Sequence, residues 1–536
     1  MKHPAHLFIF TIFILCSAVV NFSFGEDFTY DTREAYMRSG YDYTWSVIQT
    51  EFDQRTFDTE EESQQYFDLL DIMVRTGTGY GHTYYSIDLG ITQMYPRLLK
   101  LDPDPPLYAQ YRYQIAIFDR DSTNEQDRAT GMALIEIAQR MDEAQYPPMY
   151  QGEVWLKAAF VLSSVGFADE KETKDAYITG INLILLAARL DGIEPQYREH
   201  VAKKIYNFCY INRSHLTYEQ MEQLCYKLFS DPLIDPWIAH AGYGHFLVDK
   251  AWVARGKKFG YKVNDAQWEM FRTTLALADK HLTTAWEMRP GWTAPATEMI
   301  TVSMGQQFHP DRDETFWFNE VTKYQYDHIL AYQKMATASR SKWGGGSFQL
   351  YTLLDHVLEV SETHKHMGLV FMHVASMLCT DAEDPNELFS KEYYLEQATQ
   401  LMKAEADEPL GNSFPWTTRG YLELLAMYHF LEGDYEEAAV LLKAGGAKSY
   451  KFPKPWKADS RYETYNEILA TEFTDEVIKA LRAADQGEIE VTLEILKKID
   501  AHFKSQPGDP YPDIISDHKG PLNNLIIHIE AFGRDY

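Results

Sequence analysis

The chain has 536 residues and a formal net charge of −29, from 79 acidic and 50 basic residues. A chain this negative repels nucleic acid and anionic lipid, so we expect no nucleic-acid partner. Hydrophobic residues make up 45% of the sequence, which supports packed structure and argues against disorder. The length exceeds what one ordinary core supports, so the sequence predicts several domains or a solenoid.

The first 25 residues have the pattern of a secretory signal peptide. Lys2 precedes an apolar run from Leu7 to Val20, and Ser23-Phe24-Gly25 provides a small-x-small cleavage pattern. The run is shorter than the roughly 20 residues of a membrane-spanning helix, and no later segment replaces it. We therefore predict a periplasmic or secreted protein with no integral membrane segment after signal removal.

Three cysteines remain after the signal peptide: Cys209, Cys225 and Cys379. An odd and small number of cysteines indicates that disulfides do not build the fold. Cys209 and Cys225 have a spacing that allows a bridge between neighbouring helices in an oxidising compartment, and the sequence leaves that pairing open.

Nearly every segment has helical periodicity, and no run has the alternation typical of strands. Between Asp265 and Met288, large apolar residues recur at steps of three, four and seven, which places them on one helical face. Pro290 and Gly291 then end that helix. Four other units have similar patterns: Thr217–Phe229, Trp237–Val253, Phe318–Met335 and His364–Leu378. Short Pro, Gly and Asp clusters separate the units, as in antiparallel helix pairs.

The middle of the chain contains a recognisable set of features in His281–Ile300 and Trp317–Phe348. A Trp-Phe pair opens a helix, an Asp and an Ala-Tyr pair lie within it, and a Trp-Gly-Gly-small turn follows. These features resemble a bacterial domain of unknown function found in exported or envelope-associated helical-repeat proteins. The resemblance covers about the middle third of the chain; it implies a helical fold and brings no known activity.

One stripe in this region combines aromatic rings and carboxylates. Trp317, Glu320, Tyr324 and Asp327 follow a spacing of i, i+3, i+7 and i+10, which predicts one face of a helix. Rings and carboxylates together are typical of sugar-binding or acid–base sites, although a half-buried helix edge has the same pattern. We take these four residues as candidate ligand- or partner-binding residues and name no catalytic residue.

The stretch SKWGGGSF contains Trp343, Gly344, Gly345 and Gly346. Consecutive glycines allow a tight corner between helices, with the tryptophan as its packing anchor. Glycine amides before a helix, beside Arg340 and Lys342, also suit an anion-binding loop, although no Walker pattern is present. The corner is the favoured interpretation, and Trp343 and the three glycines are kept as candidate partner-binding residues.

Histidines concentrate at His356, His364, His366 and His373, near several acidic residues. No His-Glu-x-x-His motif occurs, and His366 and His373 are two helical turns apart, too far for a compact pair. We therefore predict no metal and no cofactor.

Two C-terminal segments have the helix–turn–helix scheme of a helical repeat. Tyr421–Ala444 turns at Gly433, and Glu476–Asp500 turns at Gly487. Both segments resemble the tetratricopeptide repeat, although Val491 and Thr492 stand where that family prefers small residues. The two glycines are also farther apart than the roughly 34 residues of a regular array. The resemblance implies an all-α fold of antiparallel helix pairs stacked as an irregular tetratricopeptide-like α-solenoid.

The segment between these two repeats carries lysines at every third position: Lys448, Lys451, Lys454 and Lys457. Pro453 and Pro455 favour a polyproline helix, which would place the four lysines on one edge. We expect this edge to contact carboxylates of the same chain, and docking of an anionic partner is the alternative.

These observations lead to four predicted regions: a signal peptide at 1–25, an N-terminal helical region at 26–200, a middle helical domain at 201–382 and a tetratricopeptide-like region at 383–536. Solenoids offer long concave surfaces, and the 36 tyrosines and 11 tryptophans suit contacts there. The leading hypothesis is an exported scaffold that binds a basic or neutral envelope protein or peptide. The alternative is a helical toroid enzyme acting on an extracellular or periplasmic polysaccharide. The sequence predicts no oligomeric state.

Overall fold

The computed structural model of the protein describes most of the chain. The described residues are 32–78, 84–118, 124–211, 218–256, 260–306, 312–364, 367–382, 387–389, 392–407, 415–445, 469 and 473–505. Within them the secondary structure is helical and contains no strand, which confirms the predicted all-α fold. The signal peptide and the four regularly spaced lysines lie outside the described residues, as does the side chain of Cys209.

Neighbouring helices in the sequence pack against one another along the chain, as expected for an α-solenoid. The first part contains α2 (Arg33–Asp53), α3 (Glu60–Thr78), α4 (Tyr84–Leu101), α5 (Leu107–Ile117), α6 (Asn124–Glu143), α7 (Pro148–Ser164) and α8 (Lys171–Ala187). The middle contains α9 (Pro195–Ile211), α10 (Tyr218–Ser230), α11 (Pro236–Arg255), α12 (Asp265–Met288), α13 (Ala294–Gln306), α14 (Glu314–Thr322), α15 (Ile329–Ala338), α16 (Ser347–Ser361) and α17 (Gly368–Asp381). The last part contains α18 (Glu392–Asp407), α19 (Pro415–Leu431), α20 (Tyr435–Gly445), α22 (Thr474–Asp485) and α23 (Ile489–Ser505).

Helix α12 shows how the sequence determines one of these elements. Asn264 caps its N-terminus in a reciprocal capping box with Gln267, which satisfies backbone N–H groups that the helix itself cannot pair. The predicted apolar face is buried at Phe271, Leu275 and Leu282. This face packs between α11 and α13, so the periodicity in the sequence correctly identified the core side of the helix.

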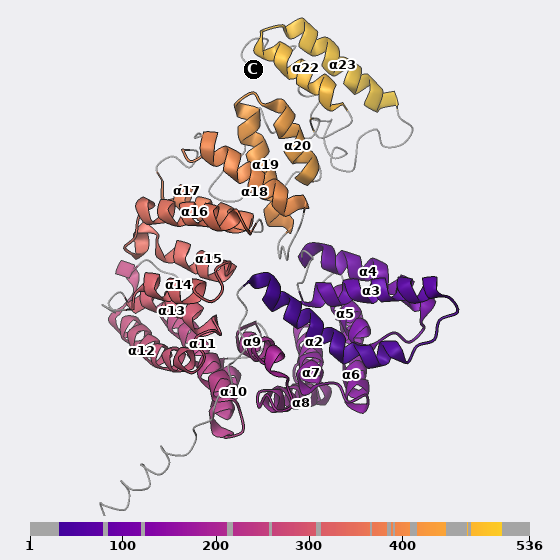
Figure 1. Ribbon diagram of the computed structural model, residues 1–536, viewed down its shortest axis with the longest axis vertical. Coiled ribbons are helices and arrows are strands. Elements are labelled where there is room, and N and C mark those ends of the chain that lie inside the picture. Colours follow the sequence, from indigo (N-terminus) through magenta and orange to yellow (C-terminus); the bar gives the residue numbers. More distant parts are fainter. Residues whose placement is uncertain are drawn as a thin grey trace, which may run out of the picture.

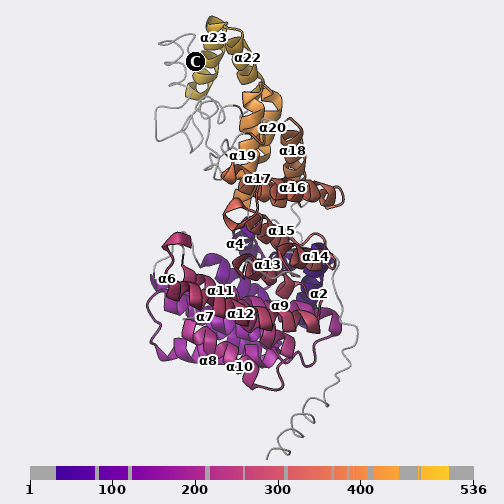
Figure 2. The same ribbon diagram turned by 90° about the vertical axis from the view of Figure 1, so that its left-hand side faces the viewer.

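The path of the helices is curved, and it returns toward its start (Figure 1). Helix α2 packs against α9, and α4 contacts α19, so segments far apart in sequence are neighbours in space. Figures 1 and 2 show the α22–α23 hairpin projecting away from this curved body. The predicted boundary after residue 200 falls inside α9, and the boundary after residue 382 follows α17; the division into regions stays a prediction.

The two predicted C-terminal hairpins are present as α19–α20 and α22–α23. Gly433 and Gly487 lie at their turns with φ angles of 82° and 77°, in the left-handed region that favours glycine. Ala438 is fully buried in α20, which allows the two helices of the first hairpin to approach closely.

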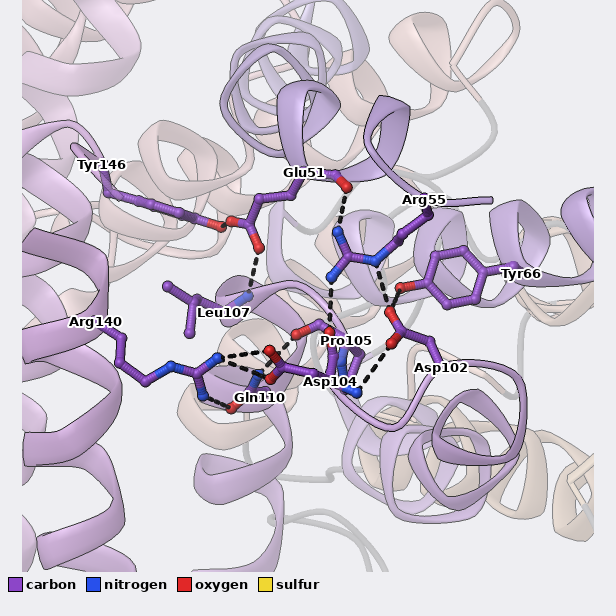
Figure 3. Close-up of polar contacts among 10 residues, drawn as sticks. All are labelled: Glu51, Arg55, Tyr66, Asp102, Asp104, Pro105, Leu107, Gln110, Arg140 and Tyr146. Carbon is purple, nitrogen blue, oxygen red and sulfur yellow. Dashed lines mark hydrogen bonds and ion pairs between the residues drawn. The ribbon is translucent and has the colours of Figure 1, made fainter. Parts of the chain in front are cut away.

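A polar network ties the first helices together (Figure 3). Arg55, just after α2, donates to the Asp102 carboxylate at 2.6 Å and to the Asp104 carbonyl at 2.8 Å. Tyr66 of α3 donates to the same Asp102 carboxylate at 2.6 Å. Burial alone raises the pKa of Asp102, but the hydrogen bonds from Tyr66 and Arg55 outweigh it and lower that pKa. The segment between α4 and α5 is thereby held against α2 and α3.

The other half of this network fixes α5 and α6 (Figure 3). Glu51 of α2 accepts from the backbone N–H of Leu107 at 3.2 Å, at the N-terminus of α5, and from the Tyr146 hydroxyl. Arg140 of α6 donates to both carboxylate oxygens of Asp104, at 2.8 and 3.0 Å. A carboxylate at a helix N-terminus is favourable because it pairs free N–H groups and complements the helix dipole.

Candidate functional site

The predicted stripe of Trp317, Glu320, Tyr324 and Asp327 does not lie on one helix. Helix α14 ends at Thr322, and Tyr324 and Asp327 lie in the turn before α15 begins at Ile329. The predicted helix Phe318–Met335 is therefore two helices, and the shared face inferred from helical spacing was wrong. The turn forms because His328 caps α15, accepting from the backbone N–H of Ala331 through Nδ1 at 3.3 Å.

The four residues differ in exposure. Trp317 is fully buried and packs edge-to-face against Trp286 and Phe316, with ring centroids 5.2 and 5.0 Å away. Glu320 and Tyr324 are partly exposed. The structure therefore explains Trp317 as a core residue, and it leaves only Glu320 and Tyr324 within reach of a partner.

Asp327 is completely buried. Its two carboxylate oxygens lie 2.8 and 3.0 Å from the backbone nitrogen of Arg33, the first residue of α2. The carboxylate therefore acts as an acceptor at the N-terminus of a distant helix, where negative charge is favourable. This contact explains why the turn contains an acidic residue, and the explanation requires no bound ligand.

The glycine stretch forms a tight corner between α15 and α16. Gly344 has a φ of 98°, and a Cβ atom at Gly345 would lie 2.1 Å from the carbonyl oxygen of Ser339. Trp343, in a short 3-10 turn (Ser341–Trp343), packs edge-to-face on Trp252 at 5.4 Å. Gly346 has an extended backbone and caps the start of α16. These contacts support the corner interpretation and account for Trp343, Gly344 and Gly345, whereas Gly346 meets no steric limit that requires glycine.

One of the two cations beside this corner, Arg340, is already paired. Arg340 donates from Nε to Asp381 of α17 at 3.0 Å, and the hydroxyl of Ser341 donates to the same carboxylate at 3.1 Å. Burial raises the pKa of Asp381, but the contacts with Arg340 and Ser341 outweigh it and lower that pKa. Because Arg340 fastens the corner to α17, it is not available to hold an anion beside the glycines.

A buried chain of polar side chains crosses four helices in the middle of the fold. The Tyr206 hydroxyl of α9 bonds to Nδ1 of His245 of α11, and Glu298 of α13 lies 3.4 Å from the same nitrogen. Lys334 of α15 pairs with the Glu298 carboxylate at 3.1 Å and donates to Thr301 at 2.9 Å. Burial alone would raise the pKa of Glu298, but Lys334 and His245 outweigh it and hold that pKa below its ordinary value. The carboxylate stays ionised and paired, so it is not suited to act as a general acid at neutral pH.

Further polar residues of α9 face α2 beside this chain. Lys203 is buried, with Nζ 3.5 Å from both Glu199 and Thr293 and 4.2 Å from the centre of the Tyr36 ring. His200 is 5% exposed, and neither of its ring nitrogens has a hydrogen-bond partner among the described residues. Both residues lie where α2 packs on α9, so they belong to the packed interior between these two helices.

The exposed surface of α16 and α18 has a different character. Phe348 is 79% exposed and Tyr393 is 56% exposed, so both rings are available to a partner. The Tyr351 and Tyr394 rings lie 6.0 Å apart and join the two helices, and the Tyr394 hydroxyl is 3.4 Å from Asp355. The acidic aromatic face is defined by eight residues: Phe348, Tyr351, Asp355 and Glu359 of α16, and Glu392, Tyr393, Tyr394 and Glu396 of α18.

The charge of this face is negative throughout. Helix α16 contains no lysine or arginine. The single lysine of α18, Lys403, pairs with Glu437 of α20 at 2.9 Å. Asp355, Glu359 and Glu396 are exposed, and no lysine or arginine of these two helices pairs with them; the one imidazole in these helices is that of His356, whose Nδ1 lies 3.5 Å from Glu359. Rings surrounded by carboxylates attract cations through both the negative ring face and the charges.

The sequence does contain a pattern that indicates the acidic aromatic face, but the candidate residues were chosen from the stripe at Trp317–Asp327 instead. Phe348, Tyr351, Asp355 and Glu359 follow i, i+3, i+7 and i+11, which places them on one side of α16. Glu392-Tyr393-Tyr394 adds rings and charge in α18. What the sequence did not indicate is that α16 and α18 lie close enough for Tyr351 to contact Tyr394 (Figure 2).

The described part of the chain contains no group of three or more His, Cys, Asp or Glu side chains arranged to hold a metal ion. Among the helices described, none has the length and apolar character needed to cross a membrane. No family model, no curated protein and no solved structure matches the chain.

Proposed function

We propose that this protein is an exported helical-repeat scaffold that binds a protein or peptide partner through the acidic aromatic face. The observation that carries the proposal is the concentration of exposed rings and of carboxylates without a lysine or arginine partner on α16 and α18. Exposed aromatic side chains are typical of binding hot spots because they bury a large area and lose little conformational freedom. Export is inferred from the signal-like residues 1–25.

The chemistry of the face favours a cationic partner. Lysine or arginine side chains would pair with Asp355, Glu359 or Glu396 and stack on the exposed rings of Phe348 and Tyr393. The stacked helices hold these groups in fixed positions, so little ordering is required when a partner binds. An extended basic segment of an envelope protein fits this surface better than an acidic or lipid partner.

The polysaccharide-enzyme alternative is less well supported by the geometry. Of the carboxylates that the sequence suggested, Asp327 is completely buried and is used by the N-terminus of α2. Glu320 is left without an identified second carboxylate across a cleft, which glycoside hydrolysis requires.

The test is site-specific photo-crosslinking in cells that export the protein. A photoreactive phenylalanine analogue replaces Phe348 or Tyr393 in separate variants, and crosslinked partners are identified by mass spectrometry. The control position is Tyr261, which is 80% exposed but lies in the short turn between α11 and α12. We expect one basic partner at positions 348 and 393 and not at 261.

A purified pair then checks the chemistry. Replacement of Asp355, Glu359 and Glu396 by the corresponding amides should weaken binding, and added salt should weaken the native complex in the same direction. Capture of the same proteins at all three positions would contradict the proposal. So would a partner that binds the amide variant as tightly as the native chain.

A further inference from the structure

Two histidines face each other where α11 and α12 pack together. His240 of α11 and His281 of α12 have their Nδ1 atoms 3.1 Å apart, and their ring centroids are 5.1 Å apart. A hydrogen bond between two neutral imidazoles needs a proton on one Nδ1 only, so the other nitrogen presents its lone pair to the same space. The two helices therefore bring two ligand-type nitrogens to one point.

The separation of these nitrogens fits two ligands of one metal ion. At a metal–nitrogen distance of about 2.0–2.1 Å, two nitrogens lie roughly 2.9 Å apart at a right angle and roughly 3.4 Å apart in a tetrahedron. The observed 3.1 Å lies between these values. When the proton of the donating Nδ1 is released and Nε2 of the same ring takes up a proton from water, that imidazole stays neutral. A small change in ring orientation then lets both Nδ1 lone pairs meet one ion.

Aromatic rings hold the pair in place. The Phe229 ring of α10 lies 5.1 Å from the His240 ring and 5.3 Å from the His281 ring, and the Tyr243 ring lies 5.0 Å from His281. Both imidazoles are nonetheless only partly buried, so solvent reaches them. Burial lowers the pKa of both imidazoles, that of His281 to about 4; His240 and then Lys280 add to the effect at His281, and Lys280 adds to it at His240.

We propose that His240 and His281 form a binding site for one divalent transition-metal ion of the zinc and copper class. Imidazole is the commonest protein ligand for these ions, and the two Nδ1 atoms already lie at a distance that suits one of them. Because no further His, Cys, Asp or Glu completes the group among the described residues, water molecules occupy the remaining positions. The ion joins α11 to α12 and is independent of the acidic aromatic face.

The test is titration of the purified mature chain with Zn²⁺ at neutral pH, followed by calorimetry and by the thermal unfolding midpoint. The expected result is one strongest binding component of unit stoichiometry that raises the midpoint. His240→Ala and His281→Ala should each abolish that component, and the double variant should lose no more than either single variant, because two ligands of one ion act together. His356→Ala, on the distant helix α16, is the matched control and should bind as the native chain does.

Two further measurements separate loss of the site from loss of the fold. His281→Gln keeps a hydrogen-bonding side chain at the contact and should fold normally while losing the zinc component. With Cu²⁺, the electron paramagnetic resonance spectrum of the native chain should show coupling to two imidazole nitrogens, reduced to one in His281→Gln. Persistence of the strongest zinc component in either alanine variant, or its loss in His356→Ala, would overturn the proposal.

Discussion

Asp327 accepts the backbone N–H of Arg33, a residue 294 positions earlier in the chain. This contact joins the start of α2 to the turn between α14 and α15, and it lies beside the packing of α2 on α9. A residue chosen from the sequence as a binding candidate thus holds two distant parts of the fold together.

Replacement of Asp327 by alanine should destabilise the protein by about 1–3 kcal/mol, because a buried N–H group at a helix terminus loses its acceptor. Asp327→Asn retains an acceptor oxygen and should be milder. Urea unfolding followed by circular dichroism measures both. Glu320→Ala, three residues beyond the start of the same predicted stripe, is the control and should change stability by less than about 0.5 kcal/mol. Equal effects at positions 320 and 327 would contradict the assignment.

Gly345→Ala and Gly346→Ala form a matched pair at the glycine corner. A Cβ atom at position 345 would lie 2.1 Å from the Ser339 carbonyl oxygen, whereas at position 346 the nearest atom is the Gln349 side chain at 3.6 Å. The first substitution should destabilise the fold by about 1–3 kcal/mol through overpacking, and the second by much less. Thermal unfolding of the two variants distinguishes a packed corner from an open loop. In an open loop, both substitutions would change the unfolding midpoint by the same small amount.

Trp343→Ala tests the same corner through its anchor. Removal of a large ring packed on Trp252 should lower the free energy of unfolding by roughly 3 kcal/mol, at the low end for large aromatics because Trp343 is only partly buried. Binding of the partner identified by crosslinking should be unchanged. Unchanged stability with reduced binding would assign Trp343 to the binding surface instead.

The ion pair of Lys334 with Glu298 should be far more sensitive than an exposed pair. Lys334→Ala leaves a buried carboxylate without its cation and should cost about 3–5 kcal/mol, measured by chemical unfolding at neutral pH. Lys403→Ala breaks the more exposed pair with Glu437 and should cost about 1 kcal/mol or less. Comparable losses would show that Glu298 is not as enclosed as the geometry indicates.

His200 should make the protein sensitive to mild acid. Burial, with Lys204 and Lys203 nearby, lowers the pKa of His200 well below its ordinary value, so the folded state keeps the ring neutral. The unfolded chain takes up the proton as the pH falls below about 6.5, and the stability contributed by the neutral ring is lost progressively from there toward the lower folded pKa. His200→Leu removes this pH-dependent loss of stability, and it also removes two buried ring nitrogens that have no hydrogen-bond partner among the described residues. The variant should gain stability over the native chain, and the gain should be larger at pH 5.5 than at pH 8 in parallel urea titrations.

The sequence identified the local architecture well and the long-range contacts poorly. Periodicity located the buried face of α12 and the turns at Gly433 and Gly487, because spacing and glycine conformation are local properties. The same periodicity continued through Thr322 and missed the break before α15, because apolar spacing persisted while His328 provided a new cap. Asp327 and Tyr394 acquire their contacts from Arg33 and Tyr351, and no local pattern indicates such neighbours.

The position of α2 also sets the order in which the molecule can fold. Pairs such as α11–α12 and α19–α20 form from contacts between adjacent segments, so they can assemble as soon as both helices have emerged. Helix α2 cannot complete its contacts until α9 and Asp327 are present, although it precedes both in the chain. Part of its apolar side therefore stays uncovered until α9 follows, and its N-terminus lacks the Asp327 acceptor until α14 and the turn after it have also formed. Closing this long loop costs chain entropy, so we expect it to be a late step of folding.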